Sequence, residues 1–240
     1  MTPLVLVHGF MGGSAQWDLQ REYLEQLCPV VTVDLPGFGE NNHLPPIATI
    51  EGFADWIIAH LVEKGITTFH LMGHSMGGMI VQQMAHQVPD RIEKLILYGT
   101  GAVGMLPGRF ETIAQSKQRA KEDGVASTAR RIAATWFVET EAAAEYPACA
   151  RIAEQSAAMA FDAGLDAMQG WSGTDYLAGN PLETLVLWGD QDRTYLWRQI
   201  ERLWRSIPST SLAVIPGCAH AVHMEKPDLF NRIVADFLTS

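Results

Sequence analysis

Short runs of apolar residues recur along the chain and alternate with longer stretches of helical periodicity. Each run is continuous and rich in β-branched or aromatic residues, and turn-forming residues flank it, which is typical of a buried strand. This pattern predicts six strands, at residues 4–8, 29–34, 69–73, 94–99, 184–190 and 211–217. The stretches between the strands predict helices at residues 18–27, 50–64, 76–87, 195–206 and 226–238.

The alternation of strands and helices predicts a parallel sheet with helices on both faces. The rhythm is interrupted between Gly101 and Gly179, where no strand is predicted and a composition rich in Ala, Gln, Glu and Arg indicates several helices. We expect this insertion to form a lid over the carboxyl edge of the sheet, where open α/β sheets bind their ligands. The predicted organisation is a core of residues 1–101 and 180–240 and a helical cap of residues 102–179.

The composition narrows the classes of function. The chain has 240 residues, of which 48% are hydrophobic and 18% charged, and this balance is typical of a globular protein with a large core. A net charge of −10 argues against general binding to nucleic acid or to an anionic membrane surface. Residues 65–89 form the longest run without Asp, Glu, Lys or Arg, but they are too rich in His, Gln and Gly for a membrane span.

The cysteines and the first residues of the chain bear on its compartment. Cys28, Cys149 and Cys218 are scattered and show no spacing for a zinc site or a disulfide framework. The opening residues, MTPLVLVHGF, have no basic segment and no cleavage pattern of a signal peptide. We therefore expect a cytoplasmic protein that uses no metal.

A serine stands between two glycines at the point where a predicted strand meets a predicted helix. Residues 71–78 read LMGHSMGG and contain the pattern G-x-S-x-G of a nucleophile elbow, centred on Ser75. A tight turn between strand and helix needs unusual backbone angles, and glycines remove side chains that would collide there. The start of the helix also favours negative charge that develops near the serine. The pattern predicts Ser75 as a nucleophile rather than an idle residue of a glycine-rich turn.

A serine hydroxyl needs a base, and the base needs an acid that orients it. His220 and His223 lie in the loop after the last predicted strand, at the edge of the sheet where Ser75 lies. Asp190 and Asp192 follow the strand TLVLWG and lie at the same edge. The order Ser, Asp, His along the chain is that of the α/β hydrolases, and the residues alone leave both choices open.

The reaction also needs hydrogen-bond donors for an oxyanion. The segment HGF at residues 8–10 follows the first predicted strand, as the elbow follows the third. The backbone N–H of Phe10 and that of Met76, which directly follows the serine, are the expected pair.

At these residues the sequence resembles the α/β-hydrolase superfamily, in its small branch of capped serine hydrolases. The segments that carry the resemblance are LVLVHGF, VDLPGFGE, LMGHSMGGMI, PDRIEKLILYG, LVLWGDQD and AHAVHMEKPDLF. In that branch the acid is the second aspartate of the G-x-x-D turn and the base follows just under thirty residues later, which implies Asp192 and His220. The resemblance also implies hydrolysis through an acyl-enzyme or a gem-diol, without metal or cofactor.

Members of this branch usually have two further strands before the HG-x motif, whereas this chain begins almost at the motif. We therefore expect a wholly parallel sheet of about six strands without the usual antiparallel hairpin. The edge that the hairpin would cover is then exposed, and a second subunit in a homodimer is one way to protect it.

The resemblance implies a small ester, lactone or carboxylate as substrate, and it leaves the reaction open. The first expectation is a serine hydrolase that cleaves a carboxylic ester or a lactone. The alternatives are a C–C bond hydrolase or lyase, of the ring-cleavage-product or menaquinone-pathway type, a cofactor-free haloperoxidase, and a non-catalytic binding protein. RRIAATWF resembles the cap of enol-lactonases, and HGFMGGSAQW resembles the opening of the menaquinone enzyme.

Several residues are candidates for contact with the substrate. Guanidinium groups bind carboxylates through two hydrogen bonds, although arginines on a helix commonly form only a solvated face. The candidate arginines are Arg109, Arg130 and Arg131. Aromatic side chains line an apolar pocket or form the core of the cap. The candidates of this kind are Trp17, Trp136 and Trp171, and His223 beside the base is a further candidate.

Overall fold

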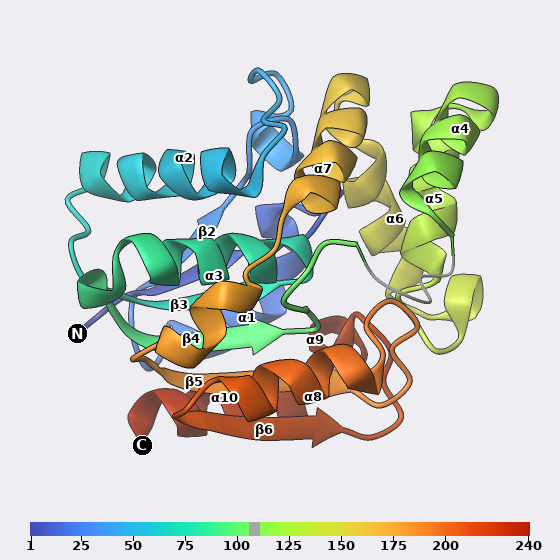
Figure 1. Cartoon of the computed structure of the whole chain (residues 1–240). Helices are drawn as coiled ribbons and strands as arrows, with labels where there is room; N and C mark the ends of the chain where they lie inside the picture. The colour runs from blue at the N-terminus through green and yellow to red at the C-terminus, as the bar shows by residue number, and fades with distance from the viewer. Residues whose placement is uncertain (106–110) are drawn as a thin grey trace.

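A parallel sheet lies at the centre of the computed structural model, which describes residues 1–105 and 111–240 (Figure 1). The strand order is β2-β1-β3-β4-β5-β6, and each pair of neighbours is parallel. The strands are β1 (Leu4–Val7), β2 (Val30–Val33), β3 (Phe69–His74), β4 (Ile92–Tyr98), β5 (Glu183–Gly189) and β6 (Thr210–Ile215). The prediction of six parallel strands is confirmed, and each observed end lies within two residues of the predicted one.

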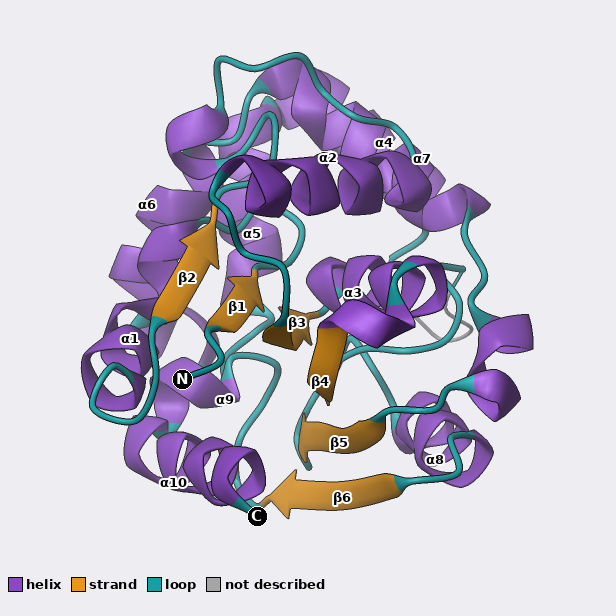
Figure 2. Cartoon of the chain, turned by 90° about the vertical axis from the view of Figure 1, so that its left-hand side faces the viewer, coloured by secondary structure: helices purple, strands orange, loops and turns teal. Residues whose placement is uncertain are grey.

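Helices cover both faces of the sheet, as predicted (Figure 2). The helices that belong to the sheet region are α1 (Asp18–Leu24), α2 (Ile50–Glu63), α3 (Met76–Gln87), α8 (Trp197–Ser206), α9 (Val222–Glu225) and α10 (Pro227–Thr239). Helices α2, α3 and α8 pack on one face, and α1, α9 and α10 pack on the other.

The two faces carry two separate hydrophobic cores, because successive residues of a strand point to opposite sides. In β1, Val5 and Val7 join the core under α2 and α3, whereas Leu4 and Leu6 join the core under α1 and α10. Strands β4 and β5 alternate in the same way and are apolar on both sides. This explains why their sequences are continuous apolar runs rather than alternating ones.

The segment between β4 and β5 is helical, and we call residues 102–179 the cap segment. Its helices are α4 (Ile113–Asp123), α5 (Val125–Ala134), α6 (Tyr146–Glu154) and α7 (Ala158–Gly170). Figure 1 shows them beside the end of the sheet to which the strand arrows point. A capping box formed by Thr112 and Gln115 begins α4. The division of the chain into a core and a separate cap domain remains our proposal.

Strands β2 and β6 form the two edges of the sheet. Most residues of both strands are partly exposed, whereas the central strands are almost wholly buried. Both edges are accessible to a second subunit, and their protection by one stays a prediction. None of the described helices has both the length and the apolar character that are needed to cross a membrane.

Candidate active site

Ser75 lies in the tight turn between β3 and α3, in a backbone conformation that residues other than glycine rarely adopt. Its φ is 57° and its ψ is −119°. A Cβ at Gly73 would lie 2.3 Å from the carbonyl oxygen of Gly77, and a Cβ at Gly77 would lie 2.4 Å from that of Val7. Both glycines are therefore required because backbone atoms occupy the space that a side chain would need.

We expect Gly77→Ala to lower the free energy of unfolding by about 3 kcal/mol, because the new methyl group overlaps rigid backbone. Gly170→Ala is the matched control, since a Cβ at Gly170 meets nothing within 4 Å and α7 gains a better helix former. Urea unfolding followed by circular dichroism measures both changes. A Gly77→Ala protein as stable as the unaltered protein would contradict this account of the elbow.

His220 and Asp192 form a buried hydrogen-bonded pair at the carboxyl edge of the sheet. His220 Nδ1 lies 2.8 Å from Asp192 Oδ2, and the other carboxylate oxygen accepts hydrogen bonds from the backbone N–H groups of Thr194 and Tyr195. Asp190 instead accepts the N–H of Gly217. Because Nδ1 donates to the carboxylate, Nε2 of His220 is the nitrogen that is available as a base.

The imidazole of His220 lies against the residues that flank Ser75 in space. Its ring centroid is 4.4 Å from that of His74, and a Cβ at Gly99 would lie 3.3 Å from its Nδ1. Within residues 1–105 and 111–240, Ser75 Oγ forms no hydrogen bond shorter than 3.5 Å. Bonds between a nucleophile and its base are often longer in an unliganded site and shorten when substrate binds.

The two expected oxyanion donors belong to segments that lie close to the serine. Gly9 packs so closely that a Cβ there would lie 2.9 Å from Ser75 Cβ, and Phe10 follows directly. Met76 is the first residue of α3, so its N–H has no acceptor within the helix. Among the described residues, the Phe10 N–H also has no backbone acceptor. Both N–H groups are therefore available to a ligand, and their role in an oxyanion hole remains a proposal.

The orientation of the Phe10 N–H is fixed by hydrogen bonds to the carbonyl group of the same peptide. The Gly9 carbonyl accepts from His8 Nδ1 at 2.7 Å and from Gly12 N at 3.0 Å. Leu35 N donates to His8 Nε2, so the proton of His8 is on Nδ1. Burial lowers the pKa of His8, which keeps the ring neutral and this tautomer in place.

Two buried side chains hold the main-chain carbonyl of His220. His74 Nε2 lies 3.1 Å from this oxygen and Tyr98 Oη lies 2.8 Å from it. A carbonyl oxygen only accepts, so His74 carries its proton on Nε2. Burial lowers the pKa of His74 well below its ordinary value, and the neighbouring His220 and His223 add to this effect. A neutral His74 thus connects the elbow directly to the backbone of the base.

His223 lies beneath His220, enclosed by Tyr98 and Trp17. Tyr98 donates its proton to the His220 carbonyl, so its oxygen accepts from His223 Nδ1 at 2.9 Å. The ring centroids of Trp17 and His223 are 4.8 Å apart, and both side chains are fully buried. This burial argues against the contact with substrate that the sequence analysis assigns to these two residues. Both side chains instead pack against His74 and Tyr98, which hold the His220 carbonyl.

Burial lowers the pKa of His223 to about 3, and this predicts a pH dependence of stability. Unfolding exposes the ring and restores an ordinary pKa near 6.5, so the unfolded chain binds one more proton between about pH 6.5 and pH 3. His223 therefore lowers the free energy of unfolding as the pH falls through this window, by about 1.4 kcal/mol per pH unit.

The slope of unfolding free energy against pH, measured between pH 7 and pH 4.5, reports how many more protons the unfolded chain binds than the folded one. We expect this number to be smaller by about one in His223→Asn. The amide of asparagine retains a donor toward Tyr98 and does not titrate. His43→Asn is the control, since His43 is exposed and lies far from this network in the chain. An unchanged slope in His223→Asn would contradict the buried neutral state of His223.

The other predicted contacts fall into two groups. Trp136 lies beside the base, with a ring centroid 6.0 Å from that of His220, and stays a candidate for substrate contact. Trp171 Nε1 donates to Gln83 on α3, which joins the cap segment to the sheet region. Its nearly complete burial gives it a packing role in this structure.

The two candidate arginines that the structure describes are engaged by carboxylates of the cap segment. Arg130 pairs with Glu154 at 2.7 Å, and Arg131 pairs with Glu111 at 3.0 Å. Arg130 is half exposed, which fits a solvated helix face better than a substrate contact. Arg109 lies outside the described residues.

An aromatic cluster lies beside residues 8–13, which we call the oxyanion loop because they carry the proposed donor Phe10. The sequence does not predict this cluster. The Phe10 ring packs on Phe161 and Phe38, at centroid distances of 5.2 and 6.1 Å. A Cβ at Gly164 of α7 would lie 2.9 Å from the Phe10 ring. The glycine within a predicted helix is the one signal in the sequence for this close approach.

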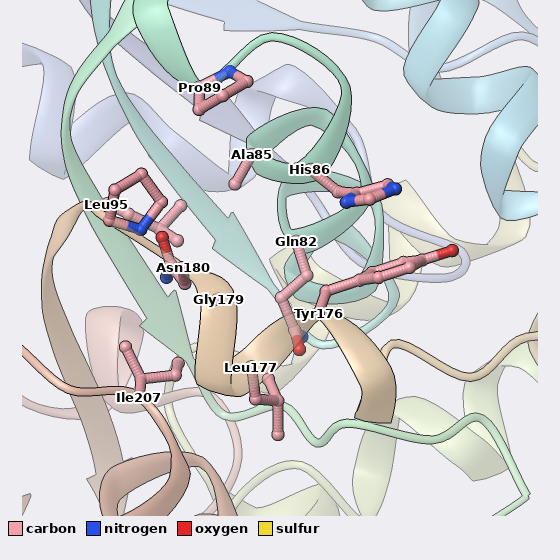
Figure 3. Close-up of a pocket in the computed structure, with 11 residues that line it drawn as sticks. Gln82, Ala85, His86, Pro89, Leu95, Tyr176, Leu177, Gly179, Asn180 and Ile207 are labelled. Carbon is pink, nitrogen blue, oxygen red and sulfur yellow. The ribbon is translucent and has the colours of Figure 1, made fainter.

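A cavity of about 150 Å³ lies away from these residues, at the far end of α3 from Ser75 (Figure 3). Its lining includes Ala85 and His86 from the end of α3, Pro89 just after that helix, and Tyr176 from the cap segment. No member of the Ser75, Asp192 and His220 set lines it, so we do not place the reaction there. In the part of the chain that the structure describes, no three His, Cys, Asp or Glu side chains are grouped to hold a metal ion.

Comparisons with known proteins bear on the fold and the family of the chain. The chain is 26% identical over 250 residues to a 2-hydroxy-6-oxononadienedioate/2-hydroxy-6-oxononatrienedioate hydrolase of Pseudomonas putida, covering 98% of this chain and 87% of that protein. A thermophilic esterase from Thermogutta terrifontis has a similar structure, with a TM-score of 0.90 and 28% identity over 100% of this chain and 90% of its own.

The enol-lactonase from Burkholderia xenovorans LB400 has the same fold, with a TM-score of 0.91 and 22% identity over 100% of this chain and 92% of its own. These similarities confirm the α/β-hydrolase fold that the sequence predicts. A family model described as the alpha/beta hydrolase family matches residues 4–233. The chain therefore belongs to the alpha/beta hydrolase family.

Proposed function

We propose that this protein is a serine hydrolase that cleaves a carboxylic ester or a lactone through Ser75, His220 and Asp192. The observation that carries the proposal is the buried hydrogen bond between His220 Nδ1 and Asp192, which leaves Nε2 free to act as a base. Ser75 lies at the same edge of the sheet, on a strained elbow. A merely structural pair would not need the serine in a backbone conformation that costs free energy.

The proposed reaction begins with attack of Ser75 Oγ on the substrate carbonyl carbon while His220 Nε2 takes the serine proton. The N–H groups of Phe10 and Met76 donate to the oxygen that becomes negative. The tetrahedral intermediate then loses the alcohol, which receives the proton from His220. Water attacks the acyl-enzyme, giving one proton to His220, and the Ser75 oxygen takes that proton as the acid leaves. Asp192 remains ionised throughout.

The surroundings of the base favour an uncharged acyl group. The rings of Trp136 and Tyr195 lie beside that of His220, and the rings of Phe10 and Phe161 are in contact beside the oxyanion loop. A carboxylate held here without a partner would have a large desolvation cost. Arg130 and Arg131 are already paired with glutamates. We therefore propose a small ester with an apolar acyl part, handled without a cofactor.

A C–C bond hydrolase is the second candidate, because the relative from Pseudomonas putida is named for dioate substrates of that kind. The same three side chains can serve both reactions, so the distinction lies in the substrate pocket. A substrate with two carboxylates needs cationic partners, and the described cap arginines of our prediction are engaged elsewhere.

A matched panel of substrates tests this choice. p-Nitrophenyl butyrate and the mono-p-nitrophenyl ester of succinic acid share a leaving group and an acyl chain of equal length, but only the second has a terminal carboxylate. We expect a kcat/KM at least about tenfold higher for the butyrate ester. An enol-lactone and a vinylogous diketone complete the panel. Faster cleavage of the diketone than of any ester would establish the C–C hydrolase instead.

A further inference from the structure

Three residues of the cap segment, Trp136–Val138, are hydrogen-bonded to both of the loops that carry the proposed acid and base. We call them the cap anchor. The first contact is from the base loop, where the N–H of Ala221 donates to the Trp136 carbonyl at 2.9 Å. Ala221 directly follows His220 in the chain. The cap anchor therefore touches the backbone of the base itself rather than a distant surface.

Arg193 connects the cap anchor to the loop of the acid. Its Nη1 donates to the Phe137 carbonyl at 2.9 Å and its Nη2 donates to the Val138 carbonyl at 3.0 Å. Arg193 follows Asp192 directly. The rigid guanidinium fork fixes both distance and direction between the two segments, which the single ammonium of a lysine would not do.

Glu225 connects the same segment to the loop of the base. Its Oε1 accepts the N–H of Val138 at 2.7 Å, and its Oε2 accepts the N–H of Ala219 at 2.6 Å. Ala219 directly precedes His220. One carboxylate therefore bridges the cap anchor and the base loop, and hydrogen bonds to an ionised acceptor are stronger than those between neutral groups.

We propose that Arg193 and Glu225 are positioning residues, which align Asp192 and His220 through their shared hydrogen bonds to the cap anchor. This inference rests on the proposed function, because it assigns these residues to the geometry of the acid–base pair. The cap segment is then part of the catalytic framework at this point, and not a lid that lifts freely from it.

The same contacts hold Trp136 over the base. Its carbonyl is bonded to Ala221, and its ring lies beside the His220 ring. Phe137 is fully buried and packs against Tyr146 of α6. Movement of the cap anchor would therefore displace an aromatic side chain from the imidazole and disturb the hydrogen bond to Asp192 at the same time.

The test uses two near-isosteric variants, Glu225→Gln and Arg193→Lys, in the full chain. Glutamine keeps the shape but offers one acceptor to two N–H groups, and lysine keeps the charge but loses the fork. Glu139→Gln and Arg198→Ala are the controls, since both residues are exposed and Glu139 directly follows the cap anchor. Because the two variants lie in different segments of the chain, the test stays informative if one of them folds poorly.

The first measurement does not depend on any substrate. The Nδ1 proton of a histidine bonded to a carboxylate gives a separate downfield signal in proton NMR, and we expect this signal in the unaltered protein. In both variants it should shift and exchange with water at least about tenfold faster, because the loss of one hydrogen bond to a charged group loosens the loop by about that factor. The controls should leave it unchanged.

The second measurement separates positioning from simple structural support. With p-nitrophenyl butyrate, we expect kcat to fall by about 10- to 100-fold while KM changes less than about threefold, and the acid limb of the pH–rate profile to move. Altered NMR exchange with unchanged kcat and pH profile would overturn the proposal. An unchanged NMR signal would overturn it too. If the unaltered protein gave no Nδ1 signal at all, this result would instead count against the proposed function.

Discussion

Ser75→Ala lowers kcat for ester hydrolysis by at least about 10⁴-fold on this account, because alanine lacks the oxygen that attacks the carbonyl carbon. Residual turnover would come from the oxyanion donors and the binding of substrate alone. The free energy of unfolding should stay within about 1 kcal/mol of the original value, since alanine keeps the Cβ and the same backbone strain. Stopped-flow or steady-state assays with p-nitrophenyl butyrate measure the rates.

Ser14→Ala is a suitable comparison for this variant. Ser14 is a partly buried serine near the oxyanion loop, and its hydroxyl donates to Asp34 rather than to any group near the base. We expect it to keep most of the activity. If Ser75→Ala retained near-normal turnover in the same assays, the assignment of the nucleophile would be wrong.

Asp192→Asn is expected to lower kcat by about 10⁴-fold, although the amide has nearly the shape of the carboxylate. The amide has no negative charge, so it cannot stabilise the positive charge that the His220 ring acquires in the transition state as the carboxylate does. Its NH₂ group also favours the tautomer with the proton on Nε2, which removes the base. KM should change little, because Asp192 is buried behind His220 and does not reach the substrate.

Asp190→Asn provides the matched control, because it makes the same chemical change two residues away. Asp190 is exposed, and among the described residues its carboxylate accepts only the N–H of Gly217, which an asparagine oxygen can also accept. Its activity should remain within about threefold of the original. Equal losses in the two variants would mean that the position of the carboxylate in the loop, rather than its bond to His220, decides activity.

Much of the fold follows from the sequence because it depends on local patterns. The six apolar runs correspond to the six strands, and two crowded glycines around Ser75 are explained by backbone atoms of β1 and α3. The choice between Asp190 and Asp192 shows the limit of such reasoning. Both residues follow the same strand, and only the resemblance to a family favours Asp192 before the structure shows its contact with His220.

Other parts of the site depend on contacts between distant segments, which one sequence does not reveal. Trp17 and His223 are of residue types that are common in binding sites, yet both are enclosed by the core under α1 and α10. Tyr98 lies near the end of a predicted strand, and nothing near it in the chain indicates its bond to the His220 carbonyl. The same holds for Arg193, whose partners are backbone carbonyls of the cap segment.

The most direct test of the central claim is the mass of the protein, and then of its peptides, after reaction with a fluorophosphonate. An arranged triad predicts one adduct for each chain, located on the peptide that contains Ser75, and at least about a 10³-fold slower reaction in His220→Ala. An adduct on a different residue, or labelling of Ser75 at the same rate without the imidazole, would contradict the claim that Ser75, His220 and Asp192 act together.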